Sequence, residues 1–188
     1  MYGAGADEET MTDQLSANDW LDQGLKTLAR RGFTALKAEP LAKAMGVSRG
    51  SFYWHFADIG AYRAAILTHW REVAAEQVIA ELETIPKGGD ALALLLRRAF
   101  SARLALERAV RSWATADTTA RAAVLEVDRR RVGYIETLLR QTGFPDEVAR
   151  GRAQVFYWAF IGYALSEQAL PKARQQAALD ELLRMAKR

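Results

Sequence analysis

The sequence predicts an all-α protein, and three observations lead to that fold class. Apolar residues recur at spacings of three and four, alanine and leucine dominate, and no stretch sustains the alternation of β-branched residues that a strand shows. The four prolines and most glycines stand between the periodic stretches, where they punctuate helices. We therefore expect an N-terminal three-helix domain over residues 16–60 and a C-terminal helical domain over 61–188, after an acidic, flexible leader over 1–15.

The predicted bounds of the N-terminal helices follow from residues that are suited to cap them. Ser16 can cap the first helix, and Gly32 supplies a left-handed residue that ends it. Gly46 makes a tight turn between the next two helices, and Ser48 is placed to cap the second of these. A long fourth helix begins near Asp58. The predicted helices cover residues 16–31, 38–45, 48–55 and 58–83.

The C-terminal helices are bounded in the same way. Asp90 and Asp117 are cap candidates, and Gly143 is a stop that precedes Pro145 at the start of a helix. That helix is apolar on every side over 155–164, so it must be covered on more than one face, and we expect a second copy of the chain to supply one cover. The predicted helices cover residues 90–106, 108–114, 118–141, 145–169 and 172–187.

Composition excludes several classes of protein. The 188 residues are 50% hydrophobic, so a packed core can form, and the absence of cysteine rules out disulfide scaffolds, zinc–thiolate sites and cysteine nucleophiles. No apolar run reaches the roughly 20 residues that a membrane helix needs. The two histidines lack metal-ligand spacing, and no catalytic pairing or phosphate-binding loop is present. We expect a cytoplasmic protein without cofactor, metal, catalytic residues or membrane partner.

Positive charge gathers near the N-terminus although the net charge is only +3. Residues 30–55 hold five bases against one acid, so we expect this region to bind an anionic partner. Within it, residues 41–56 read LAKAMGVSRGSFYWHF, which has the spacing of a helix-turn-helix. Ala42 is small where two helices cross, and Gly46 permits the turn four residues later. The second helix of such a pair can present its N-terminal end to the major groove of DNA.

Residues 16–70, and above all the run GVSRGSFYWHF over 46–56, resemble the DNA-binding domain of the TetR family of bacterial transcriptional regulators. The resemblance covers about a third of the chain; the remainder matches only in length and helical layout. It implies a homodimer, usually a repressor, whose C-terminal domain binds a small-molecule effector that alters the separation of the two recognition helices. The partners expected are therefore double-stranded operator DNA, a second copy of the chain and an unidentified effector.

The resemblance also implies which residues contact DNA. The residues themselves agree in part, because the planar fork of Arg49 suits guanine O6 and N7 and Gly50 allows close approach. For His55 the alternative is core packing, and for Trp54 a role facing DNA is favoured because Phe52 and Phe56 fill the inward face. The recognition-helix positions are Ser48, Arg49, Gly50, Ser51, Tyr53 and Trp54, and the phosphate positions are Thr34, Lys37, Lys43, Tyr53 and His55.

Two departures from the family pattern stand out. Lys37 occupies the position where the family usually has a capping Ser or Thr, and a lysine cannot accept a hydrogen bond from a backbone N–H. The family commonly places one or two lysines after the position of Phe56, whereas residues 57–60 here carry no positive charge. Phosphate contacts from the start of the fourth helix are therefore weakened.

Large side chains that should surround the centre of the C-terminal domain predict the effector pocket, with ordinary core packing as the alternative. Arginines 97, 98, 103, 108 and 111 form either an anion pocket or a solvated face, and Arg129, Arg130 and Arg131 are read as solvated. The predicted effector-binding residues are Phe100, Leu104, Trp113, Tyr134, Tyr157 and Trp158.

Two other functions remain as alternatives. One is a helical enzyme or carrier in which the N-terminal motif is coincidental, and the missing catalytic patterns weigh against it. The other is a helix-turn-helix protein that organises DNA without any effector. A change of DNA affinity on adding a ligand separates that alternative from a ligand-responsive regulator.

Overall fold

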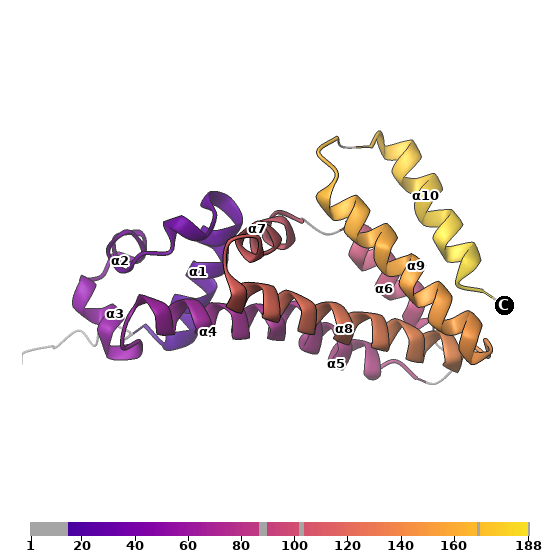
Figure 1. The fold of residues 1–188 in the computed structure, drawn as a ribbon, viewed down its shortest axis with the longest axis horizontal. Helices are drawn as coiled ribbons and strands as arrows, with labels where there is room; N and C mark the ends of the chain where they lie inside the picture. The colour runs from indigo at the N-terminus through magenta and orange to yellow at the C-terminus, as the bar shows by residue number, and fades with distance from the viewer. Residues whose placement is uncertain (1–14, 87–89, 102–103, 169, 188) are drawn as a thin grey trace, which may run out of the picture.

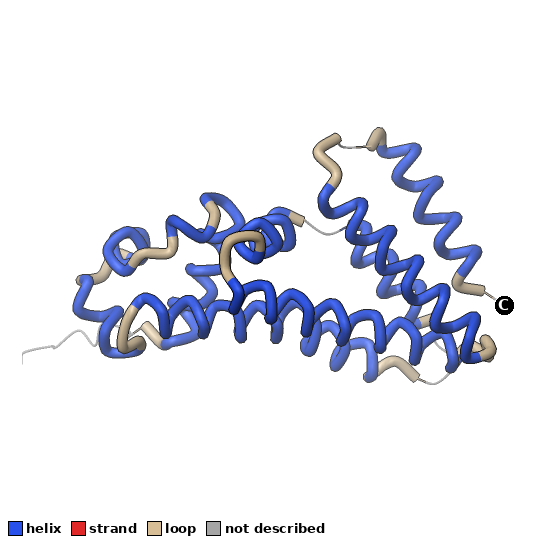
Figure 2. The backbone as a smooth tube through the Cα atoms, viewed as in Figure 1, coloured by secondary structure: helices blue, strands red, loops and turns tan. Residues whose placement is uncertain are grey.

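The computed structural model describes residues 15–86, 90–101, 104–168 and 170–187, so nearly all of the predicted leader lies outside the described residues. The regular structure of the described residues is entirely helical, which confirms the all-α class (Figure 2). A 3-10 helix, η1 (Phe33–Ala35), follows α1, and a π-helical segment, η2 (Glu72–Glu76), joins α4 to α5. The α-helices are α1 Ala17–Arg31, α2 Ala38–Met45, α3 Arg49–His55, α4 Ile59–Arg71, α5 Gln77–Glu83, α6 Ala91–Ser101, α7 Ala105–Ala114, α8 Thr118–Gln141, α9 Asp146–Leu165 and α10 Lys172–Met185.

The caps of the N-terminal helices explain where the helices begin and end. Ser16 forms a capping box with Asp19, whose carboxylate accepts from the Ser16 backbone N–H at 2.7 Å. Gly46 ends α2 in the left-handed conformation, with φ 72° and ψ 23°. Gly32 has the predicted positive φ of 75°, but its ψ of 174° lies outside the left-handed helical region. Ser48 takes the N-cap position of α3, yet its side chain makes no cap hydrogen bond, so that prediction was wrong in its chemistry.

Two buried cores lie along the molecule. The first contains Trp20 of α1 and Trp70 of α4, and it extends into Trp113 of α7 and the beginning of α8. The second joins α5, α6, α9 and α10 around the C-terminal half of α8. Figure 1 shows α1 to α3 at one end of the molecule and α6, α9 and α10 toward the other, with α4, α5 and α8 running between them. These long helices therefore connect the two ends.

The fourth predicted helix, over 58–83, has the expected extent but not a uniform α-helical geometry. Asp58 caps it by accepting from Ala61 N at 2.7 Å. The chain stays helical through η2, since Arg71 and Gln77 both keep right-handed helical angles. One continuous rod with a π-helical segment in its middle is the result. Because such segments arise from side-chain and packing demands rather than from apolar periodicity, the sequence pattern does not reveal them.

Two boundaries in the C-terminal part differ from prediction. We expected one helix to end and the next to begin near residue 107. In the structure α6 ends at Ser101 and α7 begins at Ala105, so Glu107 is a buried residue within α7. Periodicity could not place the break, since apolar residues continue at helical spacing across it. Helix α9 ends at Leu165, four residues earlier than predicted, and Ser166 is extended. Asp90 and Asp117 make the cap hydrogen bonds expected of them, to Ala93 N and Ala120 N.

In the described part of the chain, none of the helices combines the length and apolar character needed to cross a membrane.

Candidate functional site

The first turn of α3 faces solvent at the end of the molecule (Figure 1). Phe52, on the opposite side of α3, is fully buried and packs edge-on against Trp20 and Tyr62 at ring-centroid distances of 5.4 and 5.1 Å. Phe56 is buried beside it. The aromatic anchors therefore fix the orientation of α3 and leave its N-terminal residues available to a partner.

The residues predicted to contact DNA all lie at the surface or partly so. They come from η1, α2 and α3, and α2 packs against α3. Trp54 is 83% exposed, as expected for a side chain outside the core. His55 is half-buried, with its ring 6.2 Å from that of Phe56 and part of its surface in contact with solvent. The exposed members are Thr34, Lys37, Lys43, Ser48, Arg49, Gly50, Tyr53 and Trp54, and the half-buried ones are Ser51 and His55.

The Arg49 side chain is held in place on the exposed face of α3. Its Nη2 donates to the Tyr53 hydroxyl at 3.0 Å, and its guanidinium lies 5.5 Å from the centre of the Tyr53 ring. The Ser48 hydroxyl beside it is not used as a cap. This end of α3 therefore offers a positioned guanidinium, an exposed hydroxyl and unpaired helix N–H groups, which together suit base edges and phosphate oxygens.

The structure shows the consequences of the two departures from the family pattern, at Lys37 and at the start of α4. Lys37 is exposed at the N-cap position of α2 and makes no side-chain cap bond. At the start of α4 the carboxylate of Asp58 occupies the helix N-terminus by bonding to Ala61 N. A phosphate would meet negative charge there, so any phosphate contacts must come mainly from the α2 and α3 side.

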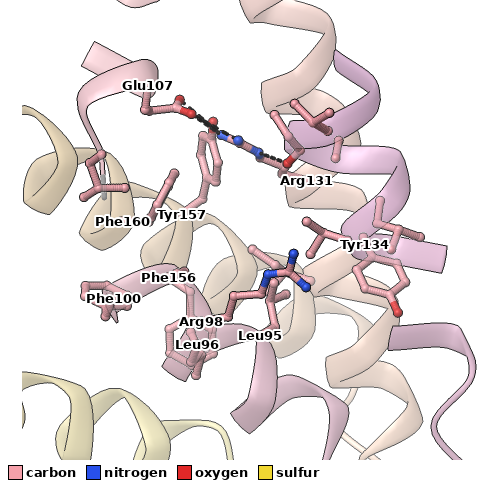
Figure 3. A pocket seen from close by; sticks show the side chains of 18 of the residues that line it. Leu95, Leu96, Arg98, Phe100, Glu107, Arg131, Tyr134, Phe156, Tyr157 and Phe160 are labelled. Atoms are coloured by element: carbon pink, nitrogen blue, oxygen red, sulfur yellow. Dashed lines mark hydrogen bonds and ion pairs between the residues drawn. The ribbon is translucent and has the colours of Figure 1, made fainter. Parts of the chain in front are cut away.

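A cavity of about 280 Å³ lies among η2, α5, α6, α7, α8 and α9 (Figure 3). Its walls are mainly apolar and aromatic, and its charged residues are Arg98, Glu107 and Arg131. It is lined by Trp70, Val73, Ala74, Ala75, Val78, Ile79, Leu95, Leu96, Arg98, Ala99, Phe100, Leu104, Leu106, Glu107, Arg131, Tyr134, Ile135, Phe156, Tyr157 and Phe160.

A buried ionic network closes one side of this cavity. Glu107, only 6% exposed, accepts from Arg131 Nη1 and Nη2 at 3.0–3.1 Å and from Arg111 Nε at 2.8 Å. Arg111 also pairs with Asp128 at 2.6 Å, and Asp128 accepts from the Tyr157 hydroxyl. Burial raises the pKa of the Tyr157 hydroxyl, and its bond to Asp128 raises it further, so it stays a donor. Two acids and two bases make the network neutral.

Arg131 also connects the network to the π-helical segment. Its Nε donates to the backbone oxygen of Ala74 in η2 at 3.2 Å. Burial acts to lower the pKa of Arg131, but Glu107 outweighs burial and the net pKa is raised, so the side chain stays charged. Arg131 of α8 therefore lines the cavity and bonds both to α7 and to the middle of the α4–α5 rod.

Comparison with known proteins identifies the N-terminal domain. Residues 21–71 match the family model described as bacterial regulatory proteins, tetR family. Over these residues the chain is similar to the regulatory proteins of that family. The match begins in α1 and ends with α4, so it contains the whole helix-turn-helix and the exposed face of α3.

Solved structures share the fold of the whole chain. A protein described as a TetR/AcrR family regulator has 21% identity and a TM-score of 0.72, covering 91% of this chain and 98% of its own. A regulator from Saccharomonospora viridis, solved in complex with choline, has 18% identity and a TM-score of 0.69 over 89% of this chain and 95% of its own. A TetR-family regulator from Rhodococcus sp. has 19% identity and a TM-score of 0.64 over 90% and 96%. No curated protein matches the chain.

The structure brings the predicted effector residues only partly together. Phe100, Leu104, Tyr134 and Tyr157 line the cavity. Trp113 is not among the lining residues; it stacks on Phe33 at 5.7 Å and belongs to the first core, because α7 packs on α1. Trp158 also lies elsewhere, on the outer face of α9, with 65% of its side chain exposed.

The arginines do not converge on one anion pocket. Arg98 lines the cavity, whereas Arg97 is exposed, and Arg103 lies outside the described residues. Arg108 donates to the backbone oxygen of Ala164 at 3.0 Å, and Arg111 belongs to the buried network. The prediction that Arg131 is solvated was wrong, because Glu107 accompanies it into the interior. Arg129 is exposed, and Arg130 pairs with Glu76 at the surface.

Sequence reasoning missed the roles of Glu107 and Asp128. Glu107 is a lone acid among several arginines, which is the one signal that could have marked it as a paired partner. Asp128 stands before three arginines and offered no such signal. Their roles depend on the packing of α7 against α8, which brings together residues 17 or more positions apart.

Proposed function

We propose that the chain is a ligand-responsive repressor that binds a palindromic operator as a homodimer. The exposed first turn of α3, anchored from behind by Phe52, is the observation that carries this proposal. Residues 16–60 would provide DNA binding and 61–188 effector binding and dimerisation. The first core supports a close connection between these parts, since Trp113 of α7 packs in the same core as Trp20 of α1.

Base contacts are assigned to the first turn of α3. The guanidinium of Arg49 is the only long cationic group on α3 and has the fork that matches a guanine edge. Gly50 has no side chain to hold DNA away. Thr34, Lys37 and Lys43 are exposed on the neighbouring η1 and α2 and would contact phosphates, which sets the register without selecting sequence.

The homodimer is assigned to the outer face of α9. Val148, Val155, Trp158 and Leu165 are exposed, and their spacings of seven, three and seven place them on one face. Gly162 lies on the same stripe, and nothing in the described residues lies near the position of an added Cβ. A two-fold axis through this stripe would let the same face of two copies pack together, as closed dimers require.

The effector is assigned to the cavity, with the α4–α5 rod as the connection to DNA. The rod begins at Asp58 beside α3, and its η2 segment lines the cavity through Val73, Ala74 and Ala75. The two recognition helices of a dimer can both bind DNA only when their spacing matches about one turn of the double helix, roughly 34–36 Å. A ligand that binds more tightly when the α4–α5 rod is displaced would change this spacing. The choline complex of the Saccharomonospora viridis protein supports binding of a small molecule by this fold.

The experiment that tests the proposal selects binding sites from random double-stranded DNA with the purified full-length protein. A two-fold symmetric sequence bound by two chains is expected. Loss of symmetry, or equal affinity for selected and scrambled DNA, would contradict operator recognition. Expressing the protein beside a reporter under the selected site then distinguishes repression from activation, and a ligand-insensitive complex would favour the alternative of a DNA-organising protein.

A further inference from the structure

The cavity has one charged group that is not fully engaged by the protein. Every oxygen of Glu107 and all three nitrogens of the Arg131 guanidinium already have partners. The Tyr157 hydroxyl is likewise occupied by Asp128 and Arg111. Arg98 differs, because only its Nη1 is bonded, to Glu81, and its Nε and Nη2 have no partner among the described residues. Figure 3 shows its guanidinium pointing in among the lining side chains.

The bond between Arg98 and Glu81 is easily exchanged. Both side chains are about half exposed, at 47% and 60%, and ion pairs in such positions contribute little net stability. A second carboxylate could therefore share or replace Glu81 on the guanidinium. Glu81 does not line the cavity, and Glu107, the acid among the described lining residues, is neutralised within its network.

The rest of the lining suits an uncharged hydrocarbon body. Aromatic side chains such as Phe100, Phe156 and Phe160 form much of the wall, and apolar walls favour apolar ligand surface. At about 280 Å³ the cavity holds on the order of nine water-sized volumes, or about ten non-hydrogen atoms. A cationic ligand would meet the positive charge of Arg98 with no free carboxylate to balance it.

We infer that this cavity binds a small apolar monocarboxylate, with its hydrocarbon body among the aromatic side chains and its carboxylate on Arg98. The inference rests on the proposed function, which assigns the effector to the same cavity. Because Arg98 lies on α6 and also contacts Glu81 of α5, a carboxylate that replaces Glu81 would remove one contact between α6 and α5, the far end of the α4–α5 rod. The charge of the ligand can thereby affect the α4–α5 rod, which leads to α3.

Calorimetric titration of the full-length protein with a matched series tests the class of ligand. Octanoate, octanol and octylammonium share the same hydrocarbon body and differ in the charge of the head group, and choline is included as a small cation. Octanoate is expected to bind at least tenfold more tightly than octanol, with octylammonium and choline weaker still. Equal or tighter binding of either cation, or no binding by any of the four, would overturn the inference.

Three variants locate the head group. Arg98→Gln should weaken octanoate binding about ten- to a hundredfold, the loss of one charge-assisted contact, and leave octanol unchanged. Arg97→Gln is the matched control, since Arg97 is exposed and does not line the cavity, and it should bind octanoate like the parent. Glu81→Gln removes the competing carboxylate and should tighten octanoate binding. An Arg98→Gln variant that binds octanoate normally contradicts the inference.

Operator binding by the same preparation separates the two proposals. If the protein binds its selected DNA and is released by a neutral or cationic ligand, the proposed function stands and the monocarboxylate does not. If octanoate binding depends on Arg98 while no DNA is bound specifically, the ligand class stands and the proposed function falls.

Discussion

At the scale of a single residue, the structure holds Arg49 in place for the DNA contact that we propose. Its bond to Tyr53, one turn along α3, limits the conformations of a long side chain before any partner arrives. Less side-chain entropy then remains to be lost on binding. Tyr53 is itself exposed, so its ring and hydroxyl form a surface next to the guanidinium.

Arg49→Ala should cost about 1–3 kcal/mol on the selected operator and relax the preference at one base position. Lys43→Ala is the comparison, because a phosphate contact weakens selected and scrambled DNA alike and reduces the salt dependence. Fluorescence anisotropy at several salt concentrations measures both. Equal losses for Arg49→Ala on the two DNAs would mean that Arg49 does not contact a base.

Gly24 lies where α1 and α4 pack closely together. A Cβ there would lie 2.2 Å from Tyr62 Oη and from Ile66 Cδ1, and the Tyr62 hydroxyl is tied to the Trp20 backbone oxygen at 2.7 Å. Gly24→Ala should therefore lower the free energy of unfolding by about 1–3 kcal/mol, even though alanine favours helix. Urea denaturation measures the change.

Gly133→Ala is the control for this prediction. Gly133 lies within α8, and no described atom lies within 4 Å of its added Cβ. Here the helix propensity of alanine acts alone and should stabilise the fold by up to about 1 kcal/mol. If Gly24→Ala were as stable as the parent protein, the two helices would not be in close contact.

At the scale of the helices, the buried network of Glu107, Arg111, Asp128 and Arg131 links α7, α8 and the α4–α5 rod. Arg131→Met leaves Glu107 without its bidentate partner and removes the bond to the Ala74 oxygen. We expect a loss of about 3–5 kcal/mol in the free energy of unfolding, as for other broken buried pairs. Thermal and urea denaturation of the pure variant provide the measurement.

Arg71→Met serves as the control at the same scale. Arg71 also joins the rod to α8, through Glu126 at 2.7 Å, but both side chains are substantially exposed. Its loss should cost less than about 1 kcal/mol, because water screens the pair. Similar losses for the two variants would show that the buried network contributes no more than a surface ion pair.

For the whole molecule, the dimer can be tested on the α9 stripe. Trp158→Glu or Gly162→Glu would place a charge in the proposed interface, so we expect monomers that lose affinity for a palindrome while binding non-specific DNA. Leu94→Glu is the control, since Leu94 is exposed on α6 instead. Sedimentation measures the mass. A full dimer in both α9 variants would place the interface elsewhere.

Linkage between ligand and DNA is the second test of the whole molecule. If a ligand lowers operator affinity by some factor, the operator must lower ligand affinity by the same factor. Titrating octanoate, or whichever compound proves to bind, into free protein and into the protein–operator complex measures both. Equal ligand affinities in the two titrations would exclude the switch even if DNA binding were tight.

Much of the fold could be predicted from local signals. Ser16 with Asp19, Gly46 and Asp117 have their effect within a few residues, so the bounds of α1, α2 and α8 follow from the sequence. The helix-turn-helix is equally local, because its two helices are consecutive and one turn sets their geometry. The family match over 21–71 agrees with this reading.

Long-range packing decided the remainder. Arg131 looks like one of three equivalent arginines in the sequence, and only the arrangement of α7 against α8 buries it on Glu107 while Arg129 stays in water. Trp113 and Trp158 are equally large, yet one faces α1 and the other the surface. Apolar periodicity tells which side of a helix is hydrophobic, but the partner of that side depends on contacts between distant segments. The amino-acid sequence by itself therefore determined most of the helices and predicted which residues face DNA, whereas the tertiary structure alone decided which side chains share the cavity and which charges are neutralised there.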